Sequence, residues 1–182
     1  MSSRPPERIL TADVSTWNLG WAATVEPGRP PATGIYGLAG PKAPLHLLYA
    51  QVRNSIEELI DEYRPDELAY VPALVGGAGQ SYTKALNGVE AMMIIAAFDK
   101  GVSIKPVKET DARGAILGRK QFGKRDARGR LIRGTGTEQA KAAALAWCDD
   151  RGWDHLDSDD VADSIVLWAY RQRALRLPLA GD

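Results

Sequence analysis

The sequence has little of the chemistry that marks extracellular, membrane or zinc proteins. Its 182 residues contain one cysteine, Cys148, which excludes an intramolecular disulfide and favours a reducing compartment. The two histidines, His46 and His155, show no spacing typical of metal ligands. No apolar run approaches the roughly 20 residues that a membrane-spanning helix needs, and the first residues lack the apolar core of a secretion signal. We therefore expect a cytoplasmic protein with no membrane partner.

Net charge is also missing. The chain has 23 basic and 23 acidic residues, and this balance argues weakly against nucleic-acid binding. The average hides two segregated stretches, because residues 118–133 hold seven basic residues and one acid, whereas residues 149–163 hold seven aspartates and one arginine. Such a separation fits a protein that binds a polyanion with one surface and cations with another. Two solvated loops are the simpler alternative.

Hydrophobic periodicity predicts an α/β fold with a mixed sheet. Apolar runs at 8–14, 21–25 and 33–38 are joined by connections too short for a helix, which predicts an antiparallel meander. Helices and strands then alternate, with helices expected at 44–63, 82–100, 109–117, 137–150 and from 159, and strands at 67–73 and 102–107. Thr137 is a candidate N-cap. The length predicts one domain over residues 1–182, with a core at about 8–172 and a basic loop at 118–136.

Three aspartates are candidate metal ligands. Asp13 follows the first apolar run, near the carboxyl end of a strand, where ligands collect in sheets of this kind. Asp160 and Asp163 share one face of the last helix and repel each other unless a cation neutralises them. Carboxylate oxygens suit Mg²⁺ or Mn²⁺, which can activate water for phosphodiester hydrolysis. Two plainer interpretations stay open: Asp13 as a turn residue, and the helical pair as first-turn aspartates, although Asp157 and Asp159 are better placed to cap.

The glycine-rich run at 75–79 lacks the Lys-Ser/Thr ending of a nucleotide P-loop and the spacing of a dinucleotide fingerprint. A loop lying over a DNA backbone is the more economical interpretation, and an ordinary turn is the alternative. Phosphate contacts are therefore expected at the start of the following helix and along the basic stretch, from Gln80, Ser81, Lys84, Arg119, Lys120, Lys124, Arg125, Arg128, Arg130 and Arg133.

In their order and spacing these motifs resemble the RuvC-like Holliday junction resolvases of the RNase H-like superfamily, over about residues 8–172. The likeness is carried by ILTAD at 9–13 with GWA at 20–22, by the glycine-rich loop after the fourth strand, and by DVADS at 160–164. It implies an RNase H-like α/β domain with a five-stranded mixed sheet flanked by helices. It also implies a homodimer that binds branched DNA, in recombination or DNA processing.

The resemblance further implies an endonuclease with Mg²⁺ or Mn²⁺ as cofactor and with Asp13, Asp160 and Asp163 as catalytic metal ligands. Relatives carry a fourth acid, a glutamate at the end of the fourth strand, where this chain has Val71. Glu67 shares strand parity with that position but lies about 13 Å along the strand. Glu90 could approach from the next helix.

The departure at Val71 leaves three explanations: an altered one-metal site, a DNA-binding protein that does not cut, or a substituted, inactive variant. The runner-up function is therefore a catalytically impaired RuvC-like DNA-binding protein. A third class, an ATP site like those of sugar kinases or actin, is disfavoured by the short length and the missing phosphate motifs.

Overall fold

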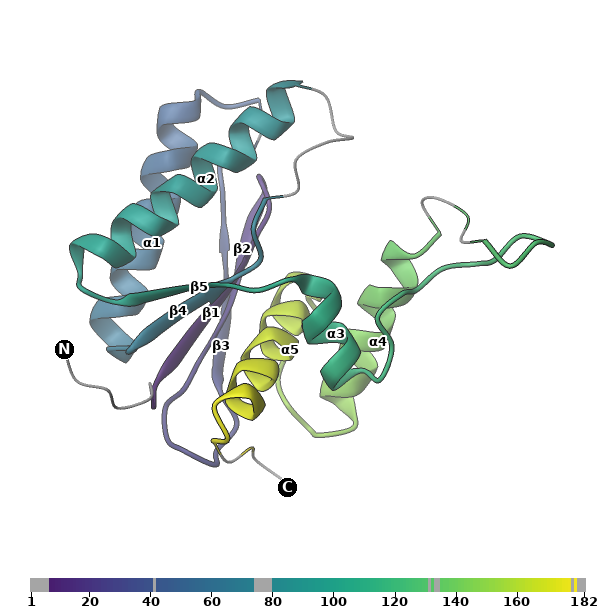
Figure 1. Cartoon of the computed structure of the whole chain (residues 1–182). Coiled ribbons are helices and arrows are strands. Elements are labelled where there is room, and N and C mark those ends of the chain that lie inside the picture. The colour runs from purple at the N-terminus through teal and green to yellow at the C-terminus, as the bar shows by residue number, and fades with distance from the viewer. Residues whose placement is uncertain are drawn as a thin grey trace.

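The computed structural model describes residues 7–40, 42–73, 80–130, 132, 135–177 and 179, without the side chains of residues 80 and 81. Within these residues the chain forms five strands and five helices (Figure 1). They are β1 (Ile9–Val14), β2 (Asn18–Ala23), β3 (Ala32–Gly37), α1 (Leu45–Tyr63), β4 (Glu67–Tyr70), α2 (Gln80–Asp99), β5 (Ser103–Pro106), α3 (Glu109–Ile116), α4 (Thr137–Asp149) and α5 (Asp159–Ala174). None of the described helices is both long and apolar enough to cross a membrane.

The strands form one mixed sheet in the order β3-β2-β1-β4-β5, which confirms the predicted five-stranded sheet. β1, β2 and β3 pair antiparallel, as the short connections predicted, and β4 lies parallel to both β1 and β5. In the β1–β4 register Ala12 lies opposite Tyr70. One residue further along, Asp13 still pairs with Gly20 of β2, whereas Val71 lies just beyond the end of β4.

Helices cover both faces of the sheet (Figure 1). Alternate strand side chains point to opposite faces, so Leu10 and Ala12 pack with α1 and α2, whereas Ile9 packs with α5 and its neighbours. α3 and α4 lie outside the sheet against α5. β4 is shorter than expected, because the strand ends at Tyr70, before Val71 and Pro72.

The helix termini correct two capping predictions. α4 begins at Thr137, but its N-cap position is Gly136 and no side chain caps it. At α5 the cap is Ser158, whose hydroxyl accepts a hydrogen bond from the Val161 amide, and not Asp157 or Asp159. Serine is a strong N-cap because its oxygen satisfies one of the unpaired amides of the first turn.

Candidate functional site

Hydrogen bonds from the middle of α5 fix that helix against β1 and β2. The hydroxyl of Thr11 donates to the carbonyl of Ser164 at 2.8 Å. The hydroxyl of Ser164 in turn donates to the carbonyl of Gly20 at 2.8 Å and accepts from the Asp13 amide at 3.0 Å. Ser164 therefore links α5, β1 and β2 at one point, next to the aspartate that the sequence singled out.

Close backbone packing fixes the first turn of α5. A Cβ added to Gly20 would lie 2.4 Å from both the carbonyl carbon and the carbonyl oxygen of Asp160, so only glycine allows this approach. The Asp160 side chain is partly exposed, and its Oδ2 accepts from the Asn18 amide nitrogen at 3.2 Å. Burial and Asp159 raise the pKa of Asp160, whereas the Asn18 hydrogen bond and Lys141 oppose the rise. Lys141, on α4, contacts Asp159 directly.

Asp163 is held by an arginine that the sequence did not single out. Nη2 of Arg113, on α3, donates to both carboxylate oxygens of Asp163, at 3.1 and 3.0 Å. The same nitrogen lies 2.6 Å from Oε1 of Glu109, one helical turn earlier. The side chains of Asp163 and Arg113 are 11% and 12% exposed. Burial raises the pKa of Asp163 to about 6, against the opposing influence of Arg113.

Asp13 lies among other acids. Burial raises its pKa well above the ordinary range, and the charges of Asp163, Asp160 and Glu109 raise it further, while Arg113 lowers it. Asp13, Asp160 and Asp163 therefore lie in one electrostatic neighbourhood. Glu109 belongs to the same neighbourhood.

Val71 lies where the resemblance placed it. It packs against the α5 side of the core and lines a small cavity together with Asp13, Glu109, Arg113 and Asp163. The cavity has a volume of about 10 Å³, close to the minimum that holds one water molecule. The end of the fourth strand thus contributes an apolar wall to this cavity.

The two other glutamates near β4 are engaged elsewhere. Glu67 forms a buried ion pair with Arg171 and does not line the cavity beside Asp13. Glu90 accepts hydrogen bonds from the Tyr70 hydroxyl at 3.1 Å and from the Ala73 amide at 3.0 Å. Those bonds hold it at the end of β4, and it does not line the cavity beside Asp13.

The donor set has the right chemistry for Mg²⁺ or Mn²⁺, since both favour carboxylate oxygens. The arrangement does not fit either ion as it stands. Both oxygens of Asp163 face Arg113, Val71 offers no donor, and the shared cavity is too small for an ion that keeps several waters. Within the described ranges no cluster of three or more acidic, histidine or cysteine side chains is arranged to hold a metal ion.

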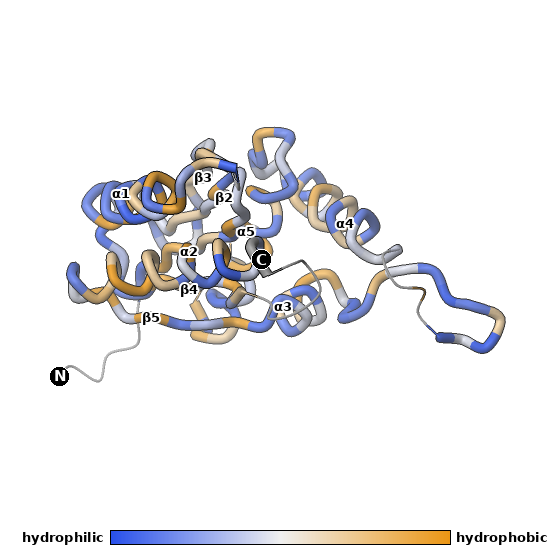
Figure 2. The backbone as a smooth tube through the Cα atoms, turned by 90° about the horizontal axis from the view of Figure 1, so that it is seen from above, coloured by the Kyte–Doolittle hydropathy of each residue, from blue (hydrophilic) through white to orange (hydrophobic). Residues whose placement is uncertain are grey.

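The basic stretch forms an arm between α3 and α4, defined here as residues 119–132. It extends away from the rest of the chain (Figures 1 and 2) and is mostly hydrophilic. Its tip is a tight hairpin, in which the Asp126 amide donates to the Arg130 carbonyl at 2.8 Å. The Asp126 carboxylate accepts from the amides of Arg128 and Arg130, each at 2.9 Å.

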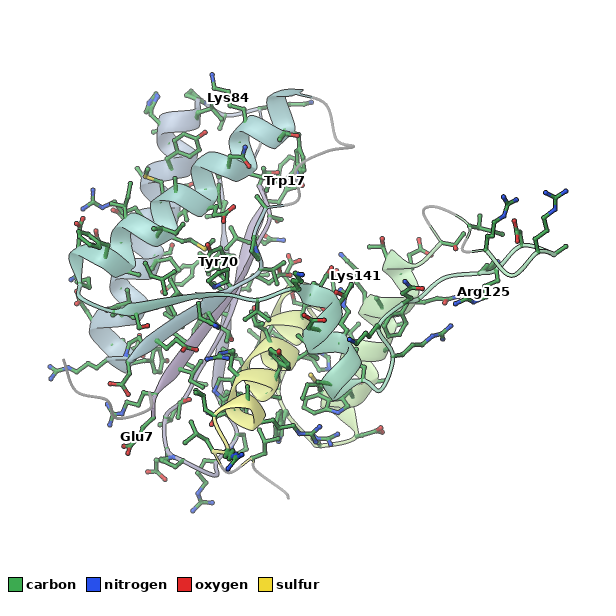
Figure 3. The ribbon with its side chains drawn as sticks, in the orientation of Figure 1. Glu7, Trp17, Tyr70, Lys84, Arg125 and Lys141 are labelled. Carbon is green, nitrogen blue, oxygen red and sulfur yellow. The ribbon has the colours of Figure 1, made fainter. Side chains whose placement is uncertain are left out.

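The structure distributes the other predicted DNA-binding residues unequally. Figure 3 shows Arg125 on the arm and Lys84 near the start of α2, away from the arm, so the two do not form one patch. Arg119 stacks over the Phe122 ring at 5.3 Å, and Lys120 lies 3.6 Å from Asp111. Arg133 and the side chains of Gln80 and Ser81 lie outside the described residues.

Sequence reasoning missed Glu109, Arg113, Asn18 and Ser164. Glu109 and Arg113 are four residues apart in a helix, which signals an ion pair but not its position. Ser164 follows Asp163 directly, yet nothing in the residue type predicts a bond to the Asp13 amide. These contacts depend on how α3 and α5 lie against β1, which only the tertiary structure gives.

Comparison with known proteins gives a fold. No family model and no curated protein matches the chain. It resembles Thermus thermophilus RuvC with a TM-score of 0.62 and 13% identity, over 94% of this chain and 98% of that one. It resembles T. thermophilus RuvC in complex with a Holliday junction substrate with a TM-score of 0.64 and 12% identity, over the same shares of the two chains. For the yeast mitochondrial Holliday junction resolvase Ydc2 the TM-score is 0.57 and the identity 13%, over 94% of this chain and 81% of that one. The chain therefore has the RNase H-like fold of the RuvC and Ydc2 resolvases.

Proposed function

We propose that this protein binds branched DNA as a homodimer. The observation that carries the proposal is the fold, which over 94% of the chain resembles that of T. thermophilus RuvC in complex with a Holliday junction substrate. A four-way junction offers equivalent strands related by symmetry. A two-fold dimer would present two copies of the Asp13 edge to them.

The arm supports the DNA-binding part of the proposal. Arg125, Arg128 and Arg130 are all exposed on the hairpin, and Figure 3 shows Arg125 beyond the body of the protein. Arginine binds phosphate oxygens well because its guanidinium carries several donors in a fixed plane. A projecting cationic hairpin can therefore follow a DNA backbone without reading the sequence.

An exposed tryptophan in the connection after β1 supports contact with unpaired bases. Trp17 is 56% exposed and lies in the β1–β2 connection, four residues after Asp13. The connection is rigid, because the Ser15 hydroxyl accepts from the Trp17 amide at 3.1 Å and the Leu38 amide donates to the Trp17 carbonyl at 2.7 Å. Indole rings stack on nucleobases, and bases at a branch point are more accessible than those within a duplex.

A binding measurement tests the proposal. Fluorescence anisotropy would compare a labelled four-way junction with a duplex of the same sequence, at about 50 and 200 mM salt. We expect the native protein to bind the junction more tightly than the duplex. When Arg125, Arg128 and Arg130 are all changed to Gln, we expect the affinity to depend less steeply on salt. At low salt that triple variant should bind the junction at least about tenfold more weakly than the native protein does. Equal affinity for junction and duplex would contradict selective binding.

A matched control removes the same charge elsewhere. Arg29, Arg53 and Lys100 are basic residues away from the arm, each paired with an acid. Changing all three to Gln alters the net charge as much as the arm variant does. If this control weakens junction binding equally, net charge and not the arm determines affinity. Sedimentation of the free protein and of its complex would test the dimer.

Metal-dependent cleavage of branched DNA is the second candidate. The observation that favours it is the crowding of negative charge around Asp13, with Asp160, Asp163 and Glu109 all acting on that carboxyl group. A divalent cation would relieve this repulsion and could supply an activated water. Val71 and the Arg113 pair oppose metal binding, so the chain fits a catalytically impaired binder better than an efficient nuclease.

Cleavage assays separate the two candidates. Junction DNA is incubated with Mg²⁺ or Mn²⁺ and the native protein, Asp13→Asn or Val71→Glu. Cutting by the native protein that disappears in Asp13→Asn supports the nuclease. Tight binding without cutting, together with cutting by Val71→Glu, supports the impaired site. Cutting that persists in Asp13→Asn would exclude Asp13 as an essential residue.

A further inference from the structure

Arg113 reaches from α3 into the centre of the acidic site. Its Nη2 donates to both oxygens of Asp163 and also lies 2.6 Å from Glu109. It lines the same small cavity as Asp13 and Val71. The guanidinium is thus the cationic group in direct contact with two of the acids that surround Asp13.

The contacts of Arg113 are those that a metal ion would need. Each oxygen of Asp163 already accepts a hydrogen bond from the guanidinium, which takes up part of its acceptor capacity. The positive charge of Arg113 in the same place also repels an incoming cation. Arginine is a permanent cation, so Arg113 offsets part of the negative charge around Asp163 without a metal ion. The apolar Val71 leaves the strand-four side of the cavity without a competing donor.

We propose that Arg113 is the resident counter-ion of this site, which holds Asp163 and Glu109 together without a divalent metal and competes with metal for Asp163. The folded protein would then not need Mg²⁺ to assemble its acidic edge. Metal would enter only when Arg113 releases Asp163. Because the proposal concerns protein side chains alone, it stands or falls without DNA.

Glu109 makes the release of Asp163 feasible. It lies one helical turn before Arg113, so the arginine can keep this partner while it leaves Asp163. Nε of Arg113 is buried and has no hydrogen-bond partner within the described part of the chain. The guanidinium is therefore incompletely satisfied in its present position, which lowers the cost of a shift toward Glu109.

Manganese binding without DNA tests the proposal. Free Mn²⁺ is followed by electron paramagnetic resonance during titration of the native protein and of Arg113→Gln. We expect weak binding by the native protein and binding at least about tenfold tighter by Arg113→Gln, the scale on which groups around a metal site change its affinity. Equal or weaker binding by Arg113→Gln would overturn the proposal.

Two controls separate competition from general electrostatics. Arg113→Lys keeps the charge and should bind Mn²⁺ far less tightly than Arg113→Gln. Arg53→Gln removes a similar charge from an exposed ion pair on α1, across the sheet, and should leave Mn²⁺ binding unchanged. An equal gain in affinity in Arg53→Gln would mean that net charge, and not the position of Arg113, controls the metal.

Thermal unfolding of the native protein keeps the proposal testable even if Arg113→Gln does not fold. A site that is held together by its own arginine should give the same melting temperature in EDTA and in millimolar Mg²⁺. A ligand that binds only the folded state raises stability with its concentration. A marked fall of the melting temperature in EDTA would therefore show that the site needs metal, and would overturn the proposal.

Discussion

Two arginine–carboxylate pairs lie at opposite ends of β4, and they differ in how completely they are satisfied. At the start of the strand, Arg171 donates from Nε and Nη2 to the two separate oxygens of Glu67, at 2.7 and 2.9 Å. At the far end, a single nitrogen of Arg113 serves both oxygens of Asp163 and also contacts Glu109. We call the Glu67–Arg171 pair closed, because each oxygen of Glu67 has its own donor nitrogen. We call the Asp163–Arg113 pair open, because one nitrogen is shared among both oxygens of Asp163 and a second acid.

The difference distinguishes a structural pair from a site. Glu67 and Arg171 are 6% and 9% exposed and balance one charge with one charge. Around Asp163 the charges do not balance, because Asp13, Asp160 and Glu109 add to it, against Arg113 and Lys141. A surplus of buried negative charge destabilises a fold, and such surpluses gather where function requires them.

The largest expected effect comes from breaking the closed pair. Arg171→Met leaves the Glu67 carboxylate buried without its partner, and should lower the free energy of unfolding by about 3–5 kcal/mol. Arg113→Met should cost less, because Asp163 lies at a partly open edge. Urea unfolding followed by circular dichroism measures both.

A double variant provides the control for that comparison. Glu67→Leu combined with Arg171→Met replaces the pair by apolar groups, and should recover most of the lost stability. If the double variant is as unstable as Arg171→Met alone, the closed pair contributes more than the neutralisation of a buried charge. If Arg113→Met lowers the free energy of unfolding as much as Arg171→Met does, the two arginine–carboxylate pairs contribute equally to stability and the distinction between them fails.

A glycine substitution tests how tightly α5 is seated at the open end. A methyl group on Gly20 would meet the Asp160 backbone at 2.4 Å, so Gly20→Ala should destabilise the protein by about 1–3 kcal/mol and displace the first turn of α5. Gly37→Ala is the matched control, because no atom lies within 4 Å of the added carbon. Equal unfolding midpoints for the two variants would contradict the close packing of Gly20.

Trp17 sharpens the comparison on the binding side. If the Asp163 end of the sheet contacts unpaired bases, Trp17→Ala should weaken junction binding by about 1–3 kcal/mol, the range for loss of a base–aromatic stack. Val25 is a similarly exposed apolar residue after the other end of β2, and Val25→Ala should leave binding unchanged. Anisotropy with junction DNA compares them. Equal losses would mean that neither residue marks a specific contact.

The sequence predicted the fold well because each element carries its own signal. The apolar runs predicted five strands, and the short connections predicted the antiparallel meander that the sheet confirms. Helical spacing also predicts that Asp160 and Asp163 lie on one face of the last helix. The approach of that face to Asp13 comes from tertiary contacts, in which Ser164 binds the Asp13 amide and the Gly20 carbonyl.

Local periodicity does not predict the partners of those aspartates. Arg113 and Asp163 are fifty positions apart, and their contact depends on how α3 lies against α5. The resemblance directed attention to Val71, but the neighbouring Glu109 emerges only from the cavity that both line. The sequence placed the cap of the last helix within 157–159 but favoured the two aspartates over Ser158, because the choice among the three residues depends on backbone angles.

The smallest expected effect concerns the pH dependence of the open end. Burial and neighbouring acids raise the pKa of Asp13, and burial raises that of Asp163 to about 6. The folded state therefore retains these protons to a higher pH than the unfolded chain. For Asp163 this contribution to stability is complete below about pH 4 and is lost as the pH rises through about 6; for Asp13 it is lost as the pH rises through that group's own raised pKa. Asp13→Asn should raise the free energy of unfolding at pH 7 by up to about 1 kcal/mol, and by less near pH 4.

Urea midpoints at pH 4, 5.5 and 7 measure this difference, roughly spanning the titration window. Asp150→Asn removes the same charge from an exposed position just after α4, so it should change the midpoint little at any of the three values. A gain confined to Asp13→Asn at pH 7 means that the crowded carboxylates destabilise the fold, as expected of a site kept for binding. A lower free energy of unfolding for Asp13→Asn at pH 7 would mean that the surroundings stabilise the Asp13 carboxylate. The charges at the open end of β4 would then be as well balanced as those at the closed end.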